Sequence, residues 1–119
     1  MLWDVSKQIG KKISIKTKTG ILYFDIESIR YIICDGHYCY IYFLGKSEGY
    51  RTLHSLKYFE EELEGLDFRR ANYNTLINPR YIADTCFSST TRTLHLTGGE
   101  DGKIESHIVS KRKVHLFEE

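Results

Sequence analysis

Three short clusters of polar side chains contain the residue types that proteins use to bind nucleic acids. They lie at 35–38 (DGHY), at 69–74 (RRANYN) and at 110–113 (SKRK). Arginine can bond the edge of a guanine through two donors and asparagine that of an adenine, whereas Ser, Lys and Arg also hold phosphates. Histidine and tyrosine can hydrogen-bond to a base or stack on it. Each cluster alone is a weak signal, but together they favour a nucleic-acid partner.

No arrangement of residues typical of an enzyme accompanies these clusters. The segment TGGEDG at 97–102 lacks the spacing of a phosphate-binding loop, and no serine occupies a nucleophile-elbow pattern. The histidines are scattered, and His37 with Cys39, two apart on a predicted strand, falls short of a zinc site. The sequence therefore predicts a protein that is not an enzyme, with no catalytic residue, metal, cofactor or small-molecule substrate.

Composition indicates a single globular domain that spans residues 1–119. Of the 119 residues, 41% are hydrophobic and 28% are charged, which suits a soluble chain with one modest core. The net charge of +1 allows a polyanionic partner without requiring one. No apolar run reaches the roughly 18 residues of a membrane span, and the first residues show no secretory signal. We therefore expect a cytoplasmic protein without membrane contact.

The cysteines are Cys34, Cys39 and Cys86, an odd number without a paired framework. Cysteines in a reducing cytoplasm generally stay unpaired. The sequence therefore predicts free thiols at all these positions, with Cys39 packed inward as a small apolar side chain.

The elements that must position the polar clusters are mostly short β-strands. Apolar and polar residues alternate with period two over 11–18 (KKISIKTK) and 37–43 (HYCYIYF), which is typical of half-buried strands. Further strands are expected at 21–26, 28–34, 50–54, 68–71, 80–87, 92–96 and 103–109, with turns at 35–36, 45–49 and 97–102. The pattern predicts a mainly β protein of antiparallel strands.

One helix interrupts these strands. Ser55 suits the N-cap position, and Leu56, Phe59 and Leu63 form an apolar stripe at helical spacing. Gly65 suits the position just after the helix. We expect this helix near residues 55–64.

The second polar cluster is followed by an apolar pair and a turn. We expect Leu76 and Ile77 to anchor the strand in the core, and the Asn78-Pro79 turn to fix its end. Asn78 is expected to shape this turn rather than to contact a ligand. The residues at 111–117 (KRKVHLF) are expected to form a short closing helix.

Four short motifs follow one another along the chain, at 29–38, 55–63, 68–82 and 109–112. In this order and spacing they resemble the LytTR-type DNA-binding domain of bacterial response regulators. The family's I-x-Y-I-E-A-x-x-N-Y, its helix beginning S-L, its F-x-R-x-H-R-S-x-I-V-N-x-x-x-I and its V-S-R-R all have counterparts here. The resemblance extends from about Ile13 to Phe117. The matching residues are Ile29, Tyr31, Ile32, Asp35, Gly36, Tyr38, Ser55, Leu56, Leu63, Phe68, Arg70, Leu76, Ile77, Asn78, Ile82, Val109, Ser110, Lys111 and Arg112.

The resemblance implies small stacked antiparallel sheets with one short helix, whose loops, rather than a recognition helix, enter successive DNA grooves. It implies sequence-specific binding to double-stranded DNA by a bacterial transcription regulator, standalone or as the output domain of a response regulator. A second copy on repeated half-sites is a further expected partner. The residues expected to contact DNA are His37, Tyr38, Arg70, Asn72, Tyr73, Asn74, Ser110, Lys111 and Arg112.

Two departures from the family pattern change the expected contacts. Asn72-Tyr73-Asn74 replaces His-Arg-Ser, and Lys111 stands where the family has its first arginine after the serine. Polar character survives, so we expect DNA binding to be kept with a changed target sequence. Tyr73 is expected to point to solvent, and Lys111 or Arg112 to contact base edges.

Two other functions fit the same sequence. The changed triplet at 72–74 and the modest net charge leave room for a protein-interaction module of the same fold that has lost DNA binding. Alternatively, Tyr38, Tyr40 and Tyr42 on one strand face could stack the bases of single-stranded RNA. The salt dependence of duplex binding tests the first alternative, and competition by single-stranded RNA tests the second.

Overall fold

The computed structural model describes residues 11–118, which form three antiparallel sheets, one α-helix and four short 3-10 helices. The first sheet pairs β1 (Lys12–Thr17) with β2 (Gly20–Asp25). The second has the order β5 (Tyr50–Thr52), β4 (Tyr38–Phe43), β3 (Ile29–Asp35), β7 (Thr75–Ile77), β6 (Arg69–Asn72). The third has the order β10 (Glu105–Ile108), β9 (Arg92–Leu96), β8 (Ile82–Phe87). The helices are η1 (Ile26–Ser28), α2 (Leu56–Glu62), η2 (Pro79–Tyr81), η3 (Glu100–Gly102) and η4 (Lys111–Leu116).

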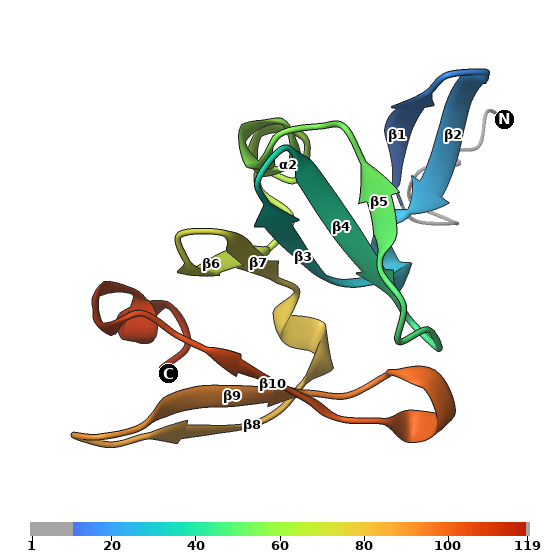
Figure 1. Cartoon of the computed structure of the whole chain (residues 1–119). Helices are drawn as coiled ribbons and strands as arrows, with labels where there is room; N and C mark the ends of the chain where they lie inside the picture. Colours follow the sequence, from blue (N-terminus) through green and yellow to red (C-terminus); the bar gives the residue numbers. More distant parts are fainter. Residues whose placement is uncertain (1–10, 119) are drawn as a thin grey trace, which may run out of the picture.

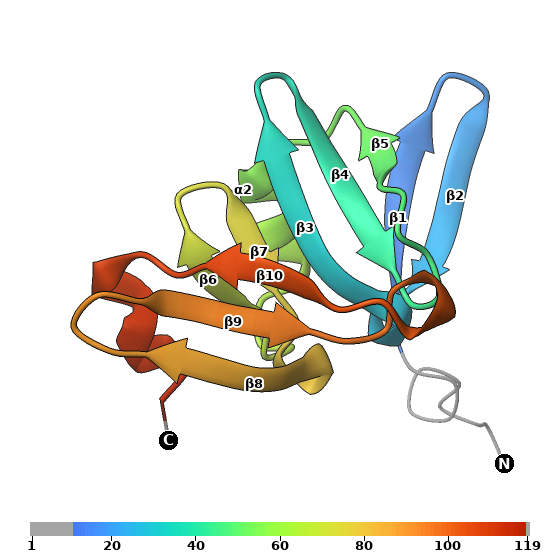
Figure 2. The ribbon, with the colours of Figure 1, turned by 60° about the horizontal axis from the view of Figure 1, so that its bottom comes forward.

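The central sheet lies between the other elements, as Figures 1 and 2 show. On one face it packs against β1 and α2, and on the other against the third sheet and η4. Each face has its own core of buried side chains. The first core contains Ile13, Ile15, Ile32, Ile41 and Phe59 among others. The second contains Tyr31, Ala71, Ile77, Tyr81, Leu94, Leu96 and Val109. The predicted fold class, mainly β with small stacked antiparallel sheets and one short helix, is confirmed.

The helix has the local features expected from its sequence. The Ser55 side chain accepts a hydrogen bond from the backbone N–H of Tyr58 at 3.1 Å, which caps the first turn. Phe59 is fully buried and Leu63 nearly so. Gly65 has a φ of +78°, a left-handed conformation that glycine adopts without steric cost. The predicted helix is therefore confirmed, two residues shorter at its C-terminal end.

Asn78 has the structural role that its position before a proline predicts. It is buried, its side-chain amide donates to the carbonyl of Ile29 at 2.9 Å, and its side-chain oxygen accepts from the N–H of Arg80 at 3.1 Å. These bonds fix the end of β7 and the start of η2. The apolar pair before it, Leu76 and Ile77, is buried in two different cores as anchors of the strand.

A buried group of polar side chains, here called the Arg30–Glu105 seam, joins the central sheet to the third sheet. Arg30 is fully buried, and all of its N–H donors are used. Two of these bonds go to the Glu105 carboxylate, and the others go to backbone carbonyls. The hydroxyl of Tyr31 donates to the same carboxylate at 2.6 Å. Burial acts to raise the pKa of Glu105, but hydrogen bonds from Arg30 and Tyr31 outweigh it, so the net pKa is lowered.

The prediction of free thiols at Cys34 and Cys39 was wrong, because these residues form a disulfide. The turn between β3 and β4 was expected at Asp35-Gly36, but it contains Gly36 and His37. This places Cys34 directly opposite Cys39 on the neighbouring strand. Two cysteines that face each other across antiparallel strands are close enough to bond. Cys86 is free, as expected, and it is exposed.

The hairpin formed by β6 and β7 was not predicted either. The second polar cluster was expected to lead through an apolar pair into a turn, whereas it forms a hairpin in which β6 and β7 flank Tyr73-Asn74. A strand of three residues is too short to display a period, so its sequence gave no separate signal. At the C-terminus the predicted short helix is confirmed as the 3-10 helix η4.

Candidate nucleic-acid interface

The three polar clusters come together along one side of the molecule, although they are far apart in the sequence. They occupy the β3–β4 turn, the β6–β7 turn and the start of η4. The β6–β7 turn and η4 lie on the left in Figures 1 and 2, and the β3–β4 turn lies nearer the centre, at the top in Figure 2. We call residues 35–38, 72–74 and 110–112 the turn edge. It is a row of strand ends and turns carried by a rigid sheet.

A hollow of about 480 Å³ separates the first two turns of this edge, and residues of both line it. The β3–β4 turn contributes His37, and the β6–β7 turn contributes Tyr73 and Asn74. Below them, the backbone N–H of Cys34 donates to the carbonyl of Asn74 at 2.9 Å. This bond extends the sheet ladder to the turn itself, so the two turns are fixed relative to each other.

Hydrogen bonds of the backbone and of side chains also hold the β6–β7 turn against the segment that leads into η4. The side-chain N–H of Asn72 donates to the carbonyl of Ile108 at 2.8 Å, and its oxygen accepts from the N–H of Asn74 at 3.1 Å. Next to it, the N–H of Ser110 donates to the carbonyl of Ala71 at 2.8 Å. The amide of Asn72 therefore positions the turn edge. Contact between Asn72 and DNA stays a prediction.

Several side chains of the turn edge are free to contact a ligand. Tyr73 is 83% exposed, which agrees with the expectation that it points to solvent. His37, Lys111 and Arg112 are exposed as well, and neither of the two cations forms an ion pair with any residue in the range 11–118. Tyr38 is half-buried beneath Arg51, whose guanidinium carbon lies 4.7 Å from the ring centroid. Unpaired donors on a fixed frame suit recognition of phosphates and base edges.

Arg70 differs from the rest of the predicted set. Its guanidinium points toward helix α2, where one nitrogen donates to the Glu60 carboxylate at 2.8 Å. Its Nε is buried without a hydrogen-bond partner among the described residues. The hollow that Arg70 lines also contains Glu64, so acidic side chains surround it. The structure does not place Arg70 on the turn edge, and its contact with DNA stays a prediction.

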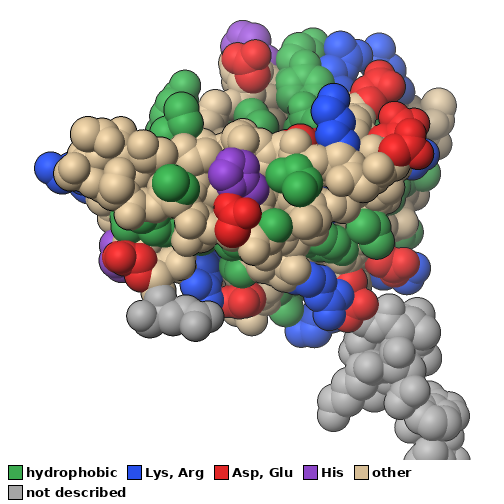
Figure 3. All heavy atoms as spheres, turned by 90° about the horizontal axis from the view of Figure 1, so that it is seen from below, with side chains coloured by type: hydrophobic (Ala, Val, Ile, Leu, Met, Phe, Trp, Pro, Cys, Tyr) green, Lys and Arg blue, Asp and Glu red, His purple; other side chains and the backbone are tan. Residues whose placement is uncertain are grey.

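The outer face of the third sheet offers a contrast. Figure 3 views the molecule from this side, and the centre of the face shows mostly uncharged side chains, with Lys and Arg toward the margins. The exposed residues of β8 are Ala83, Asp84, Thr85 and Cys86, none of which is basic. A polyanion would find no cation among these four residues, whereas the turn edge presents two.

A comparison with protein families found that the model for the LytTr DNA-binding domain matches residues 19–119. The chain belongs to the LytTr DNA-binding domain family. The match includes every residue of the turn edge. Membership of this family implies DNA binding and transcription regulation, and the family is not a catalytic one.

A comparison with solved structures agrees on the fold. The chain resembles the LytTr DNA-binding domain of a methyl-accepting/DNA response regulator from Bacillus cereus, with a TM-score of 0.63 and 19% identity. The similarity covers 89% of this chain and 92% of the other. A search of curated proteins found no match. No helix formed by residues 11–118 is long and apolar enough to cross a membrane.

Sequence reasoning missed one histidine at this interface. His54 lines the hollow between the first two turns, and its Nε2 accepts a hydrogen bond from the N–H of Lys16 at 3.1 Å. Burial and the nearby charge of Lys16 lower its pKa. The signal available in the sequence was its position just before the N-cap Ser55, where a strand end meets a helix start. A scattered histidine without a partner at metal-ligand spacing did not stand out.

Proposed function

We propose that this chain binds double-stranded DNA in a sequence-specific manner through the turn edge, and that it regulates transcription in the bacterial cytoplasm. The family match and the gathering of three polar clusters on one side support this proposal. The single observation that carries it is the unpaired, exposed set Tyr73, Lys111 and Arg112, held in place by backbone bonds at Ala71 and Cys34.

The roles of these side chains follow from their chemistry. Arg112 can bond a guanine edge with two donors, and Lys111 supplies one charged donor without that geometry. Tyr73 offers a ring for stacking and one hydroxyl for a hydrogen bond. His37 extends the contact toward the β3–β4 turn. The spacing of three turns along one edge suits contacts to successive segments of a duplex, and a second copy on a repeated half-site would double the contact.

The regulator would act alone or as the output domain of a response regulator. The Bacillus cereus protein of the same fold is described as a response regulator, which favours the second arrangement. In either arrangement, two copies of this domain would occupy a pair of half-sites. A duplex with two copies of the selected half-site should therefore bind more tightly than one with a single copy.

Selection of duplexes from a random pool tests this function directly. The protein should enrich one short motif, and its affinity for that motif should exceed its affinity for an unrelated duplex of the same length. The specific affinity should also fall as salt rises, because phosphate contacts release counterions. Enrichment of no motif, with weak binding that ignores sequence, would contradict the proposal.

A protein-interaction module is a second candidate, and two observations favour it. The amide of Asn72 is occupied by Ile108 and Asn74, and the guanidinium of Arg70 is paired with Glu60. Fewer side chains are then available for DNA than the sequence suggested. Under this alternative no duplex would bind with a steep salt dependence.

The RNA alternative is less well supported by the side-chain contacts. The ring of Tyr42 stacks on Tyr31 with centroids 4.4 Å apart, and Tyr38 is covered by Arg51. Two of the three tyrosines that were expected to stack bases are therefore already in contact with protein groups. Competition by single-stranded RNA at equal nucleotide concentration should displace little of the bound duplex.

A further inference from the structure

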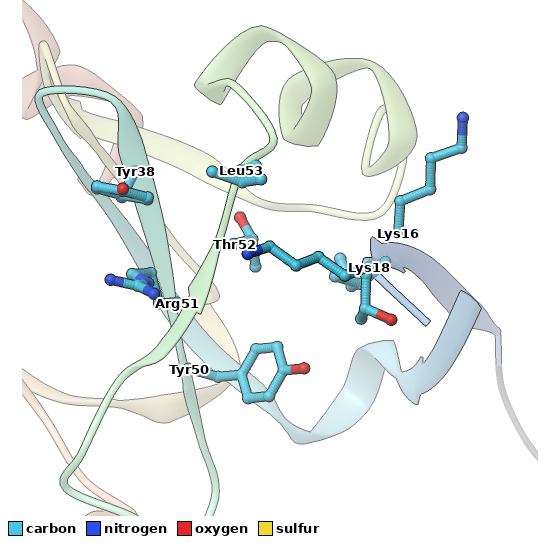
Figure 4. Close-up of a pocket in the computed structure, with 9 residues that line it drawn as sticks. Lys16, Lys18, Tyr38, Tyr50, Arg51, Thr52 and Leu53 are labelled. Carbon is cyan, nitrogen blue, oxygen red and sulfur yellow. The ribbon is translucent and has the colours of Figure 1, made fainter. Parts of the chain in front are cut away.

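A second basic surface lies next to the turn edge, in a hollow between β1 and β5. This hollow, here called the β1–β5 groove, has a volume of about 490 Å³ and opens between β1 and β5. Its lining contains three cations and no carboxylate. Figure 4 shows these side chains around the hollow. The residues that line it are Ile15, Lys16, Thr17, Lys18, Tyr38, Tyr50, Arg51, Thr52 and Leu53.

The strands position these cations by their alternation. On β1, Ile13 and Ile15 are buried, so the lysine that follows is turned outward. On β5, Thr52 is buried, and Arg51 before it is exposed. In Figure 4 the side chain of Lys18 extends across the hollow toward β5, whereas that of Lys16 points away from it. The groove therefore has one cation inside and two at its margins.

Arg51 is held in a geometry that leaves donors free. Its guanidinium carbon lies 4.7 Å from the centroid of the Tyr38 ring, a cation–π contact. Stacking of this kind uses the face of the guanidinium and leaves its N–H groups at the edge available for an anion. A guanidinium fixed in this way loses less conformational freedom when it binds phosphate.

The groove cations also lack partners within the protein. Elsewhere on the protein, some lysines and arginines are paired with acids: Lys12 contacts Asp25 at 3.2 Å, and Arg80 contacts Glu27 at 3.6 Å. Within residues 11–118, no such ion pair is formed by Lys16, Lys18 or Arg51. Three unpaired cations around one hollow repel each other, and an anion between them would relieve this repulsion.

Position links the groove to the turn edge. Tyr38 belongs to both, since it follows the β3–β4 turn and also lines the groove. His54 joins the two hollows, because it lines the one at the turn edge and bonds the backbone of Lys16. A polymer of phosphates that lies along the turn edge could therefore continue into the groove without leaving the protein surface.

We propose that the β1–β5 groove binds the phosphodiester backbone of DNA that flanks the segment contacted by the turn edge. This inference rests on the proposed function. Lys18 contacts phosphate oxygens inside the groove, and Lys16 and Arg51 contact them at its margins. These contacts carry no base preference, so the groove adds affinity while the turn edge supplies specificity.

The test compares the triple variant Lys16→Ala, Lys18→Ala, Arg51→Ala with the parent on two duplexes. The long duplex carries the selected site with flanking sequence, and the short duplex is trimmed to the site. Affinity is measured over a range of salt concentrations. On the long duplex the variant should lose affinity for selected and unrelated sequences alike, and its salt slope should fall by about 0.9 units per lost contact, or roughly two to three units in all. On the short duplex the difference should largely vanish.

Lys12→Ala is the matched control. It removes a lysine from the same strand, but that lysine is already paired with Asp25, so binding should stay near the parent value. Thermal melting checks that all variants are folded. The melting temperatures should stay near that of the parent, because every substituted side chain is exposed.

Three outcomes would overturn the inference. If the triple variant binds the long duplex like the parent at every salt concentration, the groove makes no contact, while the proposed function stands. An equal loss on both duplexes would place these cations at the base-contacting segment. If the parent itself binds no duplex, the proposed function fails and the inference fails with it.

Discussion

Two regions of this molecule are rich in polar side chains, and they differ in how many partners those side chains have. In the Arg30–Glu105 seam, every donor of Arg30 is bonded, and the Glu105 carboxylate accepts from both Arg30 and Tyr31. On the turn edge, Tyr73 is 83% exposed, and Lys111 forms no ion pair with residues 11–118. The seam therefore joins two sheets, whereas the turn edge presents exposed side chains to solvent.

The difference shows that residue type alone does not separate scaffold from binding site. Arg30 and Arg112 are both arginines near the ends of predicted strands, but one is fully buried and the other is exposed. A buried charge must be paired, because burial without a partner is costly. An exposed charge without a partner has no structural role to fill and is available for a ligand. The following predictions test this division.

The seam gives the largest expected effect. Arg30→Met should lower the free energy of unfolding by roughly 3–5 kcal/mol, because the Glu105 carboxylate and several carbonyls lose their donor inside the protein. A loss of this size is a large part of the total stability of a small domain. Denaturant unfolding monitored by circular dichroism measures it.

Arg80→Met is the control for this substitution. Arg80 is an exposed arginine whose contact with Glu27 spans 3.6 Å, so its loss should cost less than about 1 kcal/mol. Equal effects of the two substitutions would show that the buried seam has no special part in stability.

Acid should weaken the seam next. His107 contacts Tyr31 edge to face, with ring centroids 4.2 Å apart, and burial lowers its pKa from 6.5 to about 4. Between these pH values the unfolded chain binds a proton that the folded chain does not. The free energy of unfolding should therefore fall as pH drops from about 6.5 to about 4, by on the order of 2 kcal/mol. Because the pKa of Glu105 is lowered in the folded protein, the free energy of unfolding should fall further at pH values below the ordinary pKa of a glutamate.

His107→Phe should flatten this dependence, since phenylalanine keeps the ring without the titrating group. Denaturant unfolding at a series of pH values measures the slope. A variant that retains the full loss between pH 6.5 and 4 would assign the acid sensitivity to another group.

Substitutions on the turn edge should lower DNA affinity and leave the free energy of unfolding nearly unchanged. Lys111→Ala or Arg112→Ala should cost roughly 1–3 kcal/mol on the selected duplex and relax the preference at one base pair, if the side chain contacts a base edge. Lys113→Ala should at most lower the affinity for all DNA sequences alike and reduce the salt slope by about one unit. Equilibrium titration with matched and single-substituted duplexes measures both. Parent-like binding by Lys111→Ala, Arg112→Ala and the double variant would remove this segment from recognition.

Tyr73→Ala tests whether this exposed ring serves DNA binding without supporting the fold. Tyr73 is exposed, so the melting temperature should stay nearly unchanged, while DNA affinity should fall by about 1 kcal/mol through lost stacking or hydrogen bonding. Tyr31→Ala is the contrasting variant, because Tyr31 is buried in the second core and should destabilise the fold strongly. A large drop in melting temperature for Tyr73→Ala would show that its ring supports the fold.

Much of the fold could be predicted because its signals are local. Alternation in 11–18 and 37–43 gave two strands, and Ser55 with the apolar stripe gave the helix. The disulfide between Cys34 and Cys39 could not be predicted, because it depends on a turn position that differs by one residue. A shift of one residue changes which side chains face each other across a hairpin.

The candidate site was predicted in composition but not in detail. Residue types gave the three clusters, and their meeting on one edge required the fold. Whether a polar group is free depends on contacts distant in sequence. Asn72 bonds Ile108, 36 residues away, and Arg70 bonds Glu60, 10 residues away. The seam depends on a separation of 75 residues between Arg30 and Glu105, which no local pattern reveals.

Amide chemical-shift mapping of the protein with its selected duplex locates the DNA-binding surface residue by residue. If DNA binds at the turn edge, the largest shift changes fall on residues 35–38, 72–74 and 110–112, with smaller ones along the β1–β5 groove when flanking DNA is present. The outer face of β8 and β9 should change little. Shift changes centred on that outer face, or spread evenly over the molecule, would show that the turn edge is not the DNA-binding surface.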